Sequence, residues 1–433
     1  MATRASQAAN LVNAFRASQL GRRLLVTILA LAVFRLGAHV ALPGVDTTVI
    51  QSLFNSSATI FALLNLFSGG ATATLSLFAM SIIPYINASI IMQLMTVVIP
   101  KVEEWSKEGE EGYRQITKYT RWGTLVLGLL QAGGVSYYLS HYTYQGRPAF
   151  VHPGLGSILL TTLLLTAGTV LLMWIGEQIT DKGVGNGISL LVFFGIISRL
   201  PYTAQQVGSY LAAGVTPVAA IVGFLAAAIV IVGAVVYVNE GYRRIAIQYP
   251  KRVVGRRMYQ GGTTHLPIRV NQAGVIPVIF AISLLLLPYT VAQFVKPAWQ
   301  TWLQQNFSFV SWPYIVLEFF LVIVFTFFYT QVVFKPDDIA DNLKKAGGFI
   351  PGIRPGRPTA EFLARVSGRL TWAGALFLAV ISVLPSFVVM VMQIPVLYFG
   401  GTSLLILVGV ALDTLKQMQS HLLMRNYQGF MRS

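Results

Sequence analysis

The sequence contains no cysteine, which excludes disulfides, thiolate nucleophiles and cysteine metal sites. Charged residues make up only 11% of its 433 residues, whereas a soluble chain of this length carries about 25%. The five histidines are scattered and form no ligand cluster: His39, His141, His152, His265 and His421. Hydrophobic residues make up 55% of the chain and lie in long uninterrupted runs. The composition therefore predicts a polytopic membrane protein.

Motifs of common enzyme classes are missing as well. There is no H-E-x-x-H zinc motif and no G-x-x-x-x-G-K-[ST] phosphate-binding loop. Ser403 would suit an intramembrane serine protease, but no span interior offers a histidine base. We therefore expect neither catalysis nor a cofactor, and any motor has to belong to a partner.

Ten apolar runs are predicted to cross the bilayer as helices: 22–40, 75–99, 122–140, 155–176, 185–200, 217–238, 272–294, 313–334, 370–392 and 401–417. The first run is expected to be kept, because no small-residue cleavage site follows it. With a cytoplasmic N-terminus, all basic residues fall at cytoplasmic ends and loops except Arg35, Arg147, Arg199 and Lys296. This positive-inside bias predicts that both termini are cytoplasmic.

The order of spans and loops predicts the following organisation. A cytoplasmic segment (1–21) precedes a first five-helix half (22–200), which is followed by an outer loop with the sixth helix (201–238), a cytoplasmic loop (239–270), helices seven and eight (271–334), a second cytoplasmic loop (335–369), helices nine and ten (370–417) and a cytoplasmic tail (418–433).

Residues 54–99 combine a short apolar piece with a long one. The piece 54–67 is too short to span a bilayer, which needs about 20 helical residues. Ser68, Gly69 and Gly70 follow as a hinge, because glycine adopts backbone angles that other residues resist. The piece 75–99 is long enough to span and is predicted to be broken inside by Pro84. We interpret the stretch as a movable stopper hinged to a pore-lining helix; a re-entrant or interfacial helix without a moving role is the alternative.

A faint internal repeat relates the two halves. The pattern I-P-x-I-x-A occurs at 83–88 and 276–281, and G-x-S-L-L-[VI] at 187–192 and 401–406. Each pattern falls in corresponding spans of two five-span halves, and because five is odd, the halves run in opposite directions. Interrupted segments at equivalent places of an inverted repeat indicate a pathway at the midplane. Chance similarity between apolar segments is the alternative.

The predicted pathway is apolar. Coupled transporters place charges near the bilayer centre, but here the spans contain almost none there: Arg35 and Glu318 lie near the outer ends of their spans and Asp413 near the inner end of its span. Aliphatic residues occupy the repeat-related places: Ile82, Ile86, Ile188, Val192, Ile279 and Ile406. Such a ring holds no specific solute, excludes water and yields around a passing chain of any sequence. Ordinary core packing is the alternative for any one of them.

Two loops are longer than topology requires. In the loop 239–270, apolar residues alternate with other residues over 244–249, which is the pattern of a strand, and Pro250 then turns the chain. Basic residues lie both before and after this predicted strand. The loop 335–369 includes Arg354 between glycines. Both are predicted to protrude with basic tips and to bind an anionic or phosphate-bearing partner; purely topogenic charge is the alternative. The loop 101–121 has mixed charge, which predicts a solvated face.

Eight motifs carry a resemblance to a known family: NLFSGG (65–70), IPYI (83–86), KEGEEG (107–112), GNGIS (185–189), AGVIP (273–277), ADNLKK (340–345), GIRPG (352–356) and FGGTS (399–403). Together, over roughly residues 18–420, they resemble the bacterial SecY family, the channel subunit of a protein-conducting translocase. Val192 stands where that family more often has isoleucine.

The resemblance implies an all-α membrane protein, with two pseudo-symmetric, inverted five-helix halves around an hourglass pore. It makes the six aliphatic positions above the pore ring. It implies a plug at 54–67, with plug and hinge residues Phe61, Leu64, Asn65, Phe67, Ser68, Gly69 and Gly70. Spans two and seven would flank a lateral gate, for which the candidates are Asn87, Gln93, Gln131 and Asn271.

The resemblance also implies partners in the bacterial cytoplasmic membrane. The long loops would dock the SecA ATPase or the ribosome through Arg243, Arg244, Lys251, Arg252, Arg256, Arg257 and Arg354. SecE and SecG would be its membrane subunits. Signal sequences and unfolded preproteins would be its cargo, and membrane-protein segments would leave it into the lipid bilayer. The rival from another class is an inverted-repeat secondary solute transporter.

Overall fold

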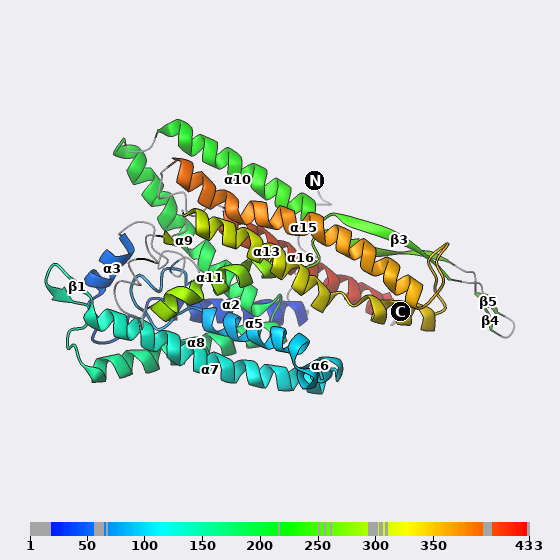
Figure 1. Cartoon of the computed structure of the whole chain (residues 1–433), viewed down its shortest axis with the longest axis horizontal. Helices are drawn as coiled ribbons and strands as arrows, with labels where there is room; N and C mark the ends of the chain where they lie inside the picture. Colours follow the sequence, from blue (N-terminus) through cyan, green and yellow to red (C-terminus); the bar gives the residue numbers. More distant parts are fainter. Residues whose placement is uncertain are drawn as a thin grey trace.

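The computed structural model describes residues 19–55, 65, 68–214, 217–249, 252–254, 257–259, 262–292, 302, 306–307, 311–392 and 401–430. Long helices run side by side along the longest axis of the molecule, and a β-hairpin extends from one end (Figure 1). The short helix α3 and the small hairpin β1–β2 lie at the opposite end (Figure 1).

The elements follow the predicted order of spans. The first half contains α2 (Gln19–Gly37), α3 (Thr47–Asn55), α5 (Ile83–Val98), α6 (Pro100–Lys107), α7 (Glu110–His141), β1 (Thr143–Tyr144), β2 (Arg147–Pro148), α8 (Leu155–Lys182) and α9 (Gly187–Ala212). The second half contains α10 (Val218–Asn239), β3 (Tyr242–Gln248), β4 (Arg252–Val254), β5 (Arg257–Tyr259), β6 (Thr263–Arg269), α11 (Ile276–Ala292), α13 (Trp312–Val333), α14 (Pro336–Lys345), α15 (Arg357–Met392) and α16 (Gly401–Phe430).

Every predicted span contains a helix, but only some helices have the length and apolarity of a span. Among the described residues, α8, α9, α10, α13 and α15 do, and α5 with α6 makes a sixth if the pair, bent by 101°, is one span. The helix α11 is a shorter apolar helix. The structure is therefore that of an apolar helical membrane protein, and the count of ten spans stays a prediction.

Several helices extend beyond the apolar runs that predicted them. The helix α7 begins at Glu110 and α15 at Arg357, both about a dozen residues before the predicted spans. The helix α9 continues past residue 200 to Ala212 although Pro201 lies inside it. Hydrophobicity marks where lipid contact ends, whereas a helix ends where caps or breakers end it. The predicted boundary at residue 200 consequently lies inside a helix.

The segment 75–99 was predicted as one span with a break, but its first eight residues, 75–82, are not helical. Residues 71–80 form turns, with a positive φ at Leu75 (42°), and Ser81 (φ 53°) follows before α5 begins at Ile83. Pro84 lies in the first turn of α5 rather than inside a helix. The predicted internal break is wrong because proline, which lacks an N–H, is favoured where that N–H has no helical partner.

The four repeated motifs all begin helices. The I-P-x-I-x-A pairs open α5 and α11, and the G-x-S-L-L pairs open α9 and α16. Asn186 caps α9, since its side-chain oxygen accepts a hydrogen bond from the Ser189 amide at 3.1 Å. Equivalent sequence therefore has an equivalent place in the local structure of both halves.

One large apolar core joins the two halves. It draws buried residues from α5, α8, α9, α11, α13, α15 and α16, among them Ile82, Leu172, Val278, Val322 and Leu405. The halves touch through α11, which contacts α5 and α7, and through α16, which contacts α9. Because lipid tails are as apolar as these side chains, van der Waals packing rather than removal of surface from water stabilises contacts between membrane-spanning helices.

The two long connecting segments pack together. The predicted strand is confirmed as β3, which pairs antiparallel with β6 from Tyr242↔Arg269 to Gln248↔Thr263. We call residues 242–269 the long hairpin. Gln248 and Phe349 exchange both backbone hydrogen bonds, at 2.9 and 3.0 Å, so the second segment joins the hairpin. Beneath them lies a small core of Ile245, Ile268, Ile350 and Leu363.

Leu363 tests this small core. Its side chain is fully buried, so Leu363→Ala is expected to destabilise the unit by about 2–5 kcal/mol through lost transfer energy and a residual cavity. Thermal unfolding of the purified protein measures the change. Leu376→Ala on the same helix is the matched control, because Leu376 is 51% exposed. Equal stability losses for both variants would contradict this packing.

Candidate functional site

The six aliphatic positions belong to one apolar cluster. Ile82, Ile86, Val192, Ile279 and Ile406 are between 0% and 8% exposed, and Ile188 packs against them as a partly buried member. They come from four helix starts: Ile82 caps α5, which carries Ile86, while α9, α11 and α16 carry the others. The structure thus gathers residues from both halves that are more than 300 positions apart in sequence.

A glycine on α8 brings two of these positions together. A Cβ built on Gly176 would lie 3.3 Å from Ile188 Cγ1 and 3.6 Å from Ile82 Cδ1. The two isoleucines therefore both lie over the backbone of α8 at Gly176, where an added Cβ would be in tight contact with Ile188 and in ordinary van der Waals contact with Ile82. Because no polar atom belongs to these side chains, the contact excludes water without binding a solute.

The plug residues lie largely outside the described residues. Phe61, Leu64 and Phe67 cannot be placed, and residues 54–55 of the predicted plug form the end of α3. The hinge is described, and the expectation of unusual backbone angles is confirmed by Gly69 (φ 67°) and Gly70 (φ 96°).

The hinge is held by hydrogen bonds. Ser68 is fully buried, and its hydroxyl lies 2.7 Å from Thr72 Oγ1 and accepts a hydrogen bond from the Thr72 amide. The Asn65 side-chain oxygen accepts from the Ala73 amide at 3.0 Å, and its carbonyl accepts from the Gly70 amide at 2.9 Å. This segment is therefore an ordered base rather than a loose connection.

Arg35 is the charge inside the first apolar run, and its partner lies in this base. Arg35 Nη1 donates to the Gly69 carbonyl oxygen at 3.0 Å, which ties α2 to the hinge. A charge at such a place is costly unless it has a polar partner. Sequence alone singled out the charge but not the partner, which is 34 residues away.

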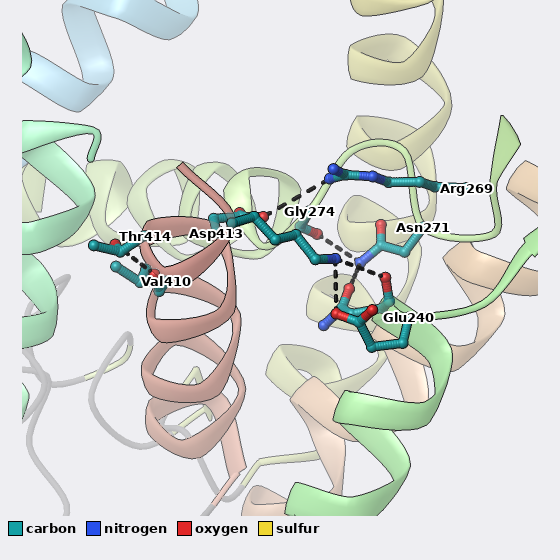
Figure 2. Close-up of polar contacts among 9 residues, drawn as sticks. Glu240, Arg269, Asn271, Gly274, Val410, Asp413 and Thr414 are labelled. Atoms are coloured by element: carbon teal, nitrogen blue, oxygen red, sulfur yellow. Dashed lines mark hydrogen bonds and ion pairs between the residues drawn. The ribbon is translucent and has the colours of Figure 1, made fainter. Parts of the chain in front are cut away.

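The gate candidates divide into two groups. Asn87 is buried on α5 and Gln131 on α7, and within the part of the chain that the structure describes neither Asn87 amide atom nor Gln131 Nε2 has a hydrogen-bond partner. Gln93, also on α5, donates to the Ser89 hydroxyl at 3.3 Å. Asn271 lies elsewhere, just before α11, where its Nδ2 donates to Asn239 Oδ1 and the Gly274 carbonyl (Figure 2). The structure does not place Asn271 with the other three.

The basic docking candidates lie at the end of the molecule that carries the long hairpin. Arg243 and Arg244 are exposed on β3, and Arg252 and Arg257 pair with Tyr259 and Val254 in β4–β5. Arg354 is exposed in a turn whose flanking glycines both have positive φ. Lys251 and Arg256 lie outside the described residues.

The loop of mixed charge is confirmed as a solvated surface. Lys107 Nζ lies 2.6 Å from Glu103 Oε1, and Arg114 Nη2 lies 3.1 Å from Glu110 Oε1, with all four side chains at least half exposed. Hydrogen bonding to Lys107 lowers the pKa of Glu103, and the same bond raises the pKa of Lys107. Such exposed pairs contribute little to stability.

Solved structures with the same architecture define the class of this fold. The structure of a protein-conducting channel matches with a TM-score of 0.63 and 16% identity, covering 93% of this chain and 92% of that one. Sec61 in the canine ribosome-channel complex matches with a TM-score of 0.60 and 17% identity over the same shares. The fold is therefore that of the protein-conducting channels.

Sequence comparison gives the family. The SecY family model matches residues 76–415. The protein translocase subunit SecY of Corynebacterium glutamicum is 45% identical over 442 residues, covering 98% of this chain and 99% of the relative. That of Streptomyces galbus is 44% identical over 439 residues, covering 97% and 98%. The chain belongs to the SecY family.

The contact of Arg35 with Gly69 can be tested directly. Arg35→Met removes a charged donor from a backbone carbonyl, which should weaken the hinge by about 1–3 kcal/mol. Hydrogen exchange at the hydrogen-bonded amides of 70–76 should then accelerate. Arg35→Lys, which keeps a charged donor, is the matched control and should retain most of the protection; unchanged exchange in Arg35→Met would contradict the contact.

Proposed function

We propose that this chain forms the pore through which unfolded secretory polypeptides cross the bacterial cytoplasmic membrane, and from which membrane-protein segments leave sideways into lipid. Membership of the SecY family establishes the coarser statement: the chain is a channel subunit of a protein translocase and not an enzyme. The inverted-repeat solute transporter is not favoured.

One observation carries the proposal: aliphatic side chains from both halves meet in a single buried cluster at the starts of four helices. A solute carrier needs polar or charged groups at such a depth to hold its substrate. An aliphatic ring forms no hydrogen bonds with cargo, so it accepts any sequence, and it closes again by excluding water. We assign the ring to Ile82, Ile86, Ile188, Val192, Ile279 and Ile406.

We assign the resting seal to this ring together with the plug at 54–67. The ordered base at 68–72 supports this assignment, because a movable segment needs a fixed point from which to move. The repeated motifs at four helix starts support two inverted, pseudo-symmetric halves with ten spans. The positive-inside bias supports cytoplasmic termini and the predicted division of the chain into segments.

We place the lateral gate between α11 and the pair α5 and α7. These helices contact one another, yet Asn87 and Gln131 keep buried amide atoms without partners in the described structure. Each unsatisfied group costs about 1–3 kcal/mol, so the closed gate is weaker than an apolar contact of the same area. A gate that signal sequences must open is expected to have such a weakness.

We infer that the long hairpin and the turn of Arg354 dock a cytoplasmic partner, the SecA motor or the ribosome. Their exposed arginines suit acidic protein surfaces and RNA phosphates. Structural relatives include Sec61 and Ssh1 channels on ribosomes, which supports the ribosome as one partner. SecE and SecG are proposed as membrane subunits that cover exposed apolar faces, such as that of α10 with Val222, Ile229 and Val230.

The ring predicts a leak when it becomes polar. Changing Ile86 and Ile279 together to Asn should let water and ions into the resting pore and raise its conductance in planar bilayers. A lowering of the barrier by about 1.4 kcal/mol raises ion passage about tenfold. Ile229→Asn is the control, because Ile229 is 73% exposed on α10. If the double variant has the same resting conductance as the control, the six aliphatic residues do not form the seal.

Docking through Arg354 predicts a loss of partner-driven transport. Arg354→Glu should lower ATP-driven export into proteoliposomes about tenfold, the cost of losing one strong interface residue, and should leave thermal stability unchanged because Arg354 is exposed. Arg357→Glu, three residues away and 90% exposed, is the control and should have a small effect. Equal export by both variants would show that the turn does not dock the motor.

A further inference from the structure

Two ion pairs hold both ends of the long hairpin to α16 (Figure 2). Lys416 Nζ lies 2.9 Å from Glu240 Oε1, and Glu240 directly follows α10, two residues before β3 begins. Asp413 Oδ1 lies 3.9 Å from Nη1 of Arg269, the last residue of β6. Asp413 and Lys416 are three positions apart, so they lie on the same face of α16. We call Glu240, Arg269, Asp413 and Lys416 the clasp.

Hydrogen bonds close the gap between the two hairpin ends. The Val270 amide donates to the Gly241 carbonyl at 2.9 Å. Asn271 Nδ2 donates to Asn239 Oδ1 at 2.9 Å and to the Gly274 carbonyl at 3.1 Å. The chain enters the hairpin from α10 and leaves it toward α11 through one connected set of polar contacts.

The segment that leaves the hairpin lies against α16. A Cβ built on Gly409 of α16 would collide with Val275 Cγ1, so the bare helix backbone admits this side chain. Gly274 has φ 64°, and a Cβ there would lie 3.7 Å from Asp413 Oδ2. The contact of this segment therefore covers about one turn of α16, from Gly409 to Asp413.

The same two helices carry ring residues. Ile406 lies seven positions before Asp413 on α16, about 10 Å along the helix. The helix α11 begins at Ile276, directly after the segment that packs on α16, and it carries Ile279. The base of the hairpin is thus joined to one helix of the proposed gate and to one further helix of the ring.

We propose that Asp413 and Lys416 are positioning residues that hold the hairpin, α11 and α16 together, so that a partner acting on the hairpin displaces both helices as one body. The inference rests on the proposed function, because it assumes that a partner docks on the hairpin and that the ring must widen.

Exposure distinguishes this role from simple stabilisation. The Arg269 and Asp413 side chains are 49% and 56% exposed, and exposed ion pairs add little to folding stability. Their geometry matters more, because one pair lies at each end of the hairpin and ties that end to α16.

The test uses the complete translocase, reconstituted in proteoliposomes with its ATP-driven motor and a preprotein. Asp413→Asn and Lys416→Gln should each lower the rate of translocation about three- to tenfold, in the range of coupling between contacting charges. Motor affinity and thermal stability should stay unchanged. The charge swap Arg269→Asp with Asp413→Arg should restore most of the rate.

Asp341→Asn is the matched control, because Asp341 is an exposed carboxylate on α14 at the same end of the molecule. Unaltered translocation by the Asp413 and Lys416 variants, with an active wild type, would overturn the clasp and leave the proposed function intact. An inactive wild-type complex would overturn both.

If Asp413→Asn or Lys416→Gln lowers thermal stability, the charge swap between Arg269 and Asp413 decides between positioning and stabilisation. A swap that restores stability but not rate would show that the pair only supports the fold, which would also overturn the proposal.

Discussion

The structure depends on the inability of lipid to hydrogen-bond a backbone. Any turn at membrane depth must find its partners within the protein, and the non-helical stretch 68–82 does so. The Leu42 amide donates to the Leu75 carbonyl, and the Leu77 amide donates to the Val40 carbonyl, so the segment after α2 pairs with this stretch. Because those bonds are made, the chain can turn inside the bundle and deliver Ile82 to the start of α5. The position of Ile82 in the apolar cluster therefore depends on backbone hydrogen bonds made by the stretch that precedes it.

Apolar and polar contacts have separate places in this molecule. At the centre, the aliphatic side chains of the large core touch without directional bonds, so they can separate and re-form at little cost in geometry. At the end that carries the hairpin, ion pairs and amide contacts fix relative positions, as between Lys416 and Glu240. A channel for cargo of arbitrary sequence benefits from both, because the constriction must adapt whereas the docking end must stay in register.

Local sequence signals predicted the fold well, and long-range partners could not be predicted. The motif at 187–192 was placed at the opening of a span, and Asn186 indeed caps α9 there. The motif at 83–88 was placed inside the span 75–99, whereas it opens α5, because proline is favoured in the first turn of a helix. The helix ends were missed where charged residues continue a helix beyond the lipid, as at Glu110 of α7. The partners of Arg35 and Asp413 were missed because they lie 34 and 144 residues away. Asn271 was assigned to the gate by resemblance, yet its amide belongs to the hairpin base.

The contrast between Asn271 and Asn87 explains where this fold is firm and where it is weak. Both side chains are buried. Among the residues that the structure describes, Asn271 Nδ2 has two acceptors while its Oδ1 has no partner, and neither amide atom of Asn87 has a partner. The two bonds that Asn271 donates resist separation of α10 from the segment before α11, whereas an amide without partners favours any state in which water reaches it. The hairpin base is therefore held by directed hydrogen bonds that the buried amide on α5 lacks.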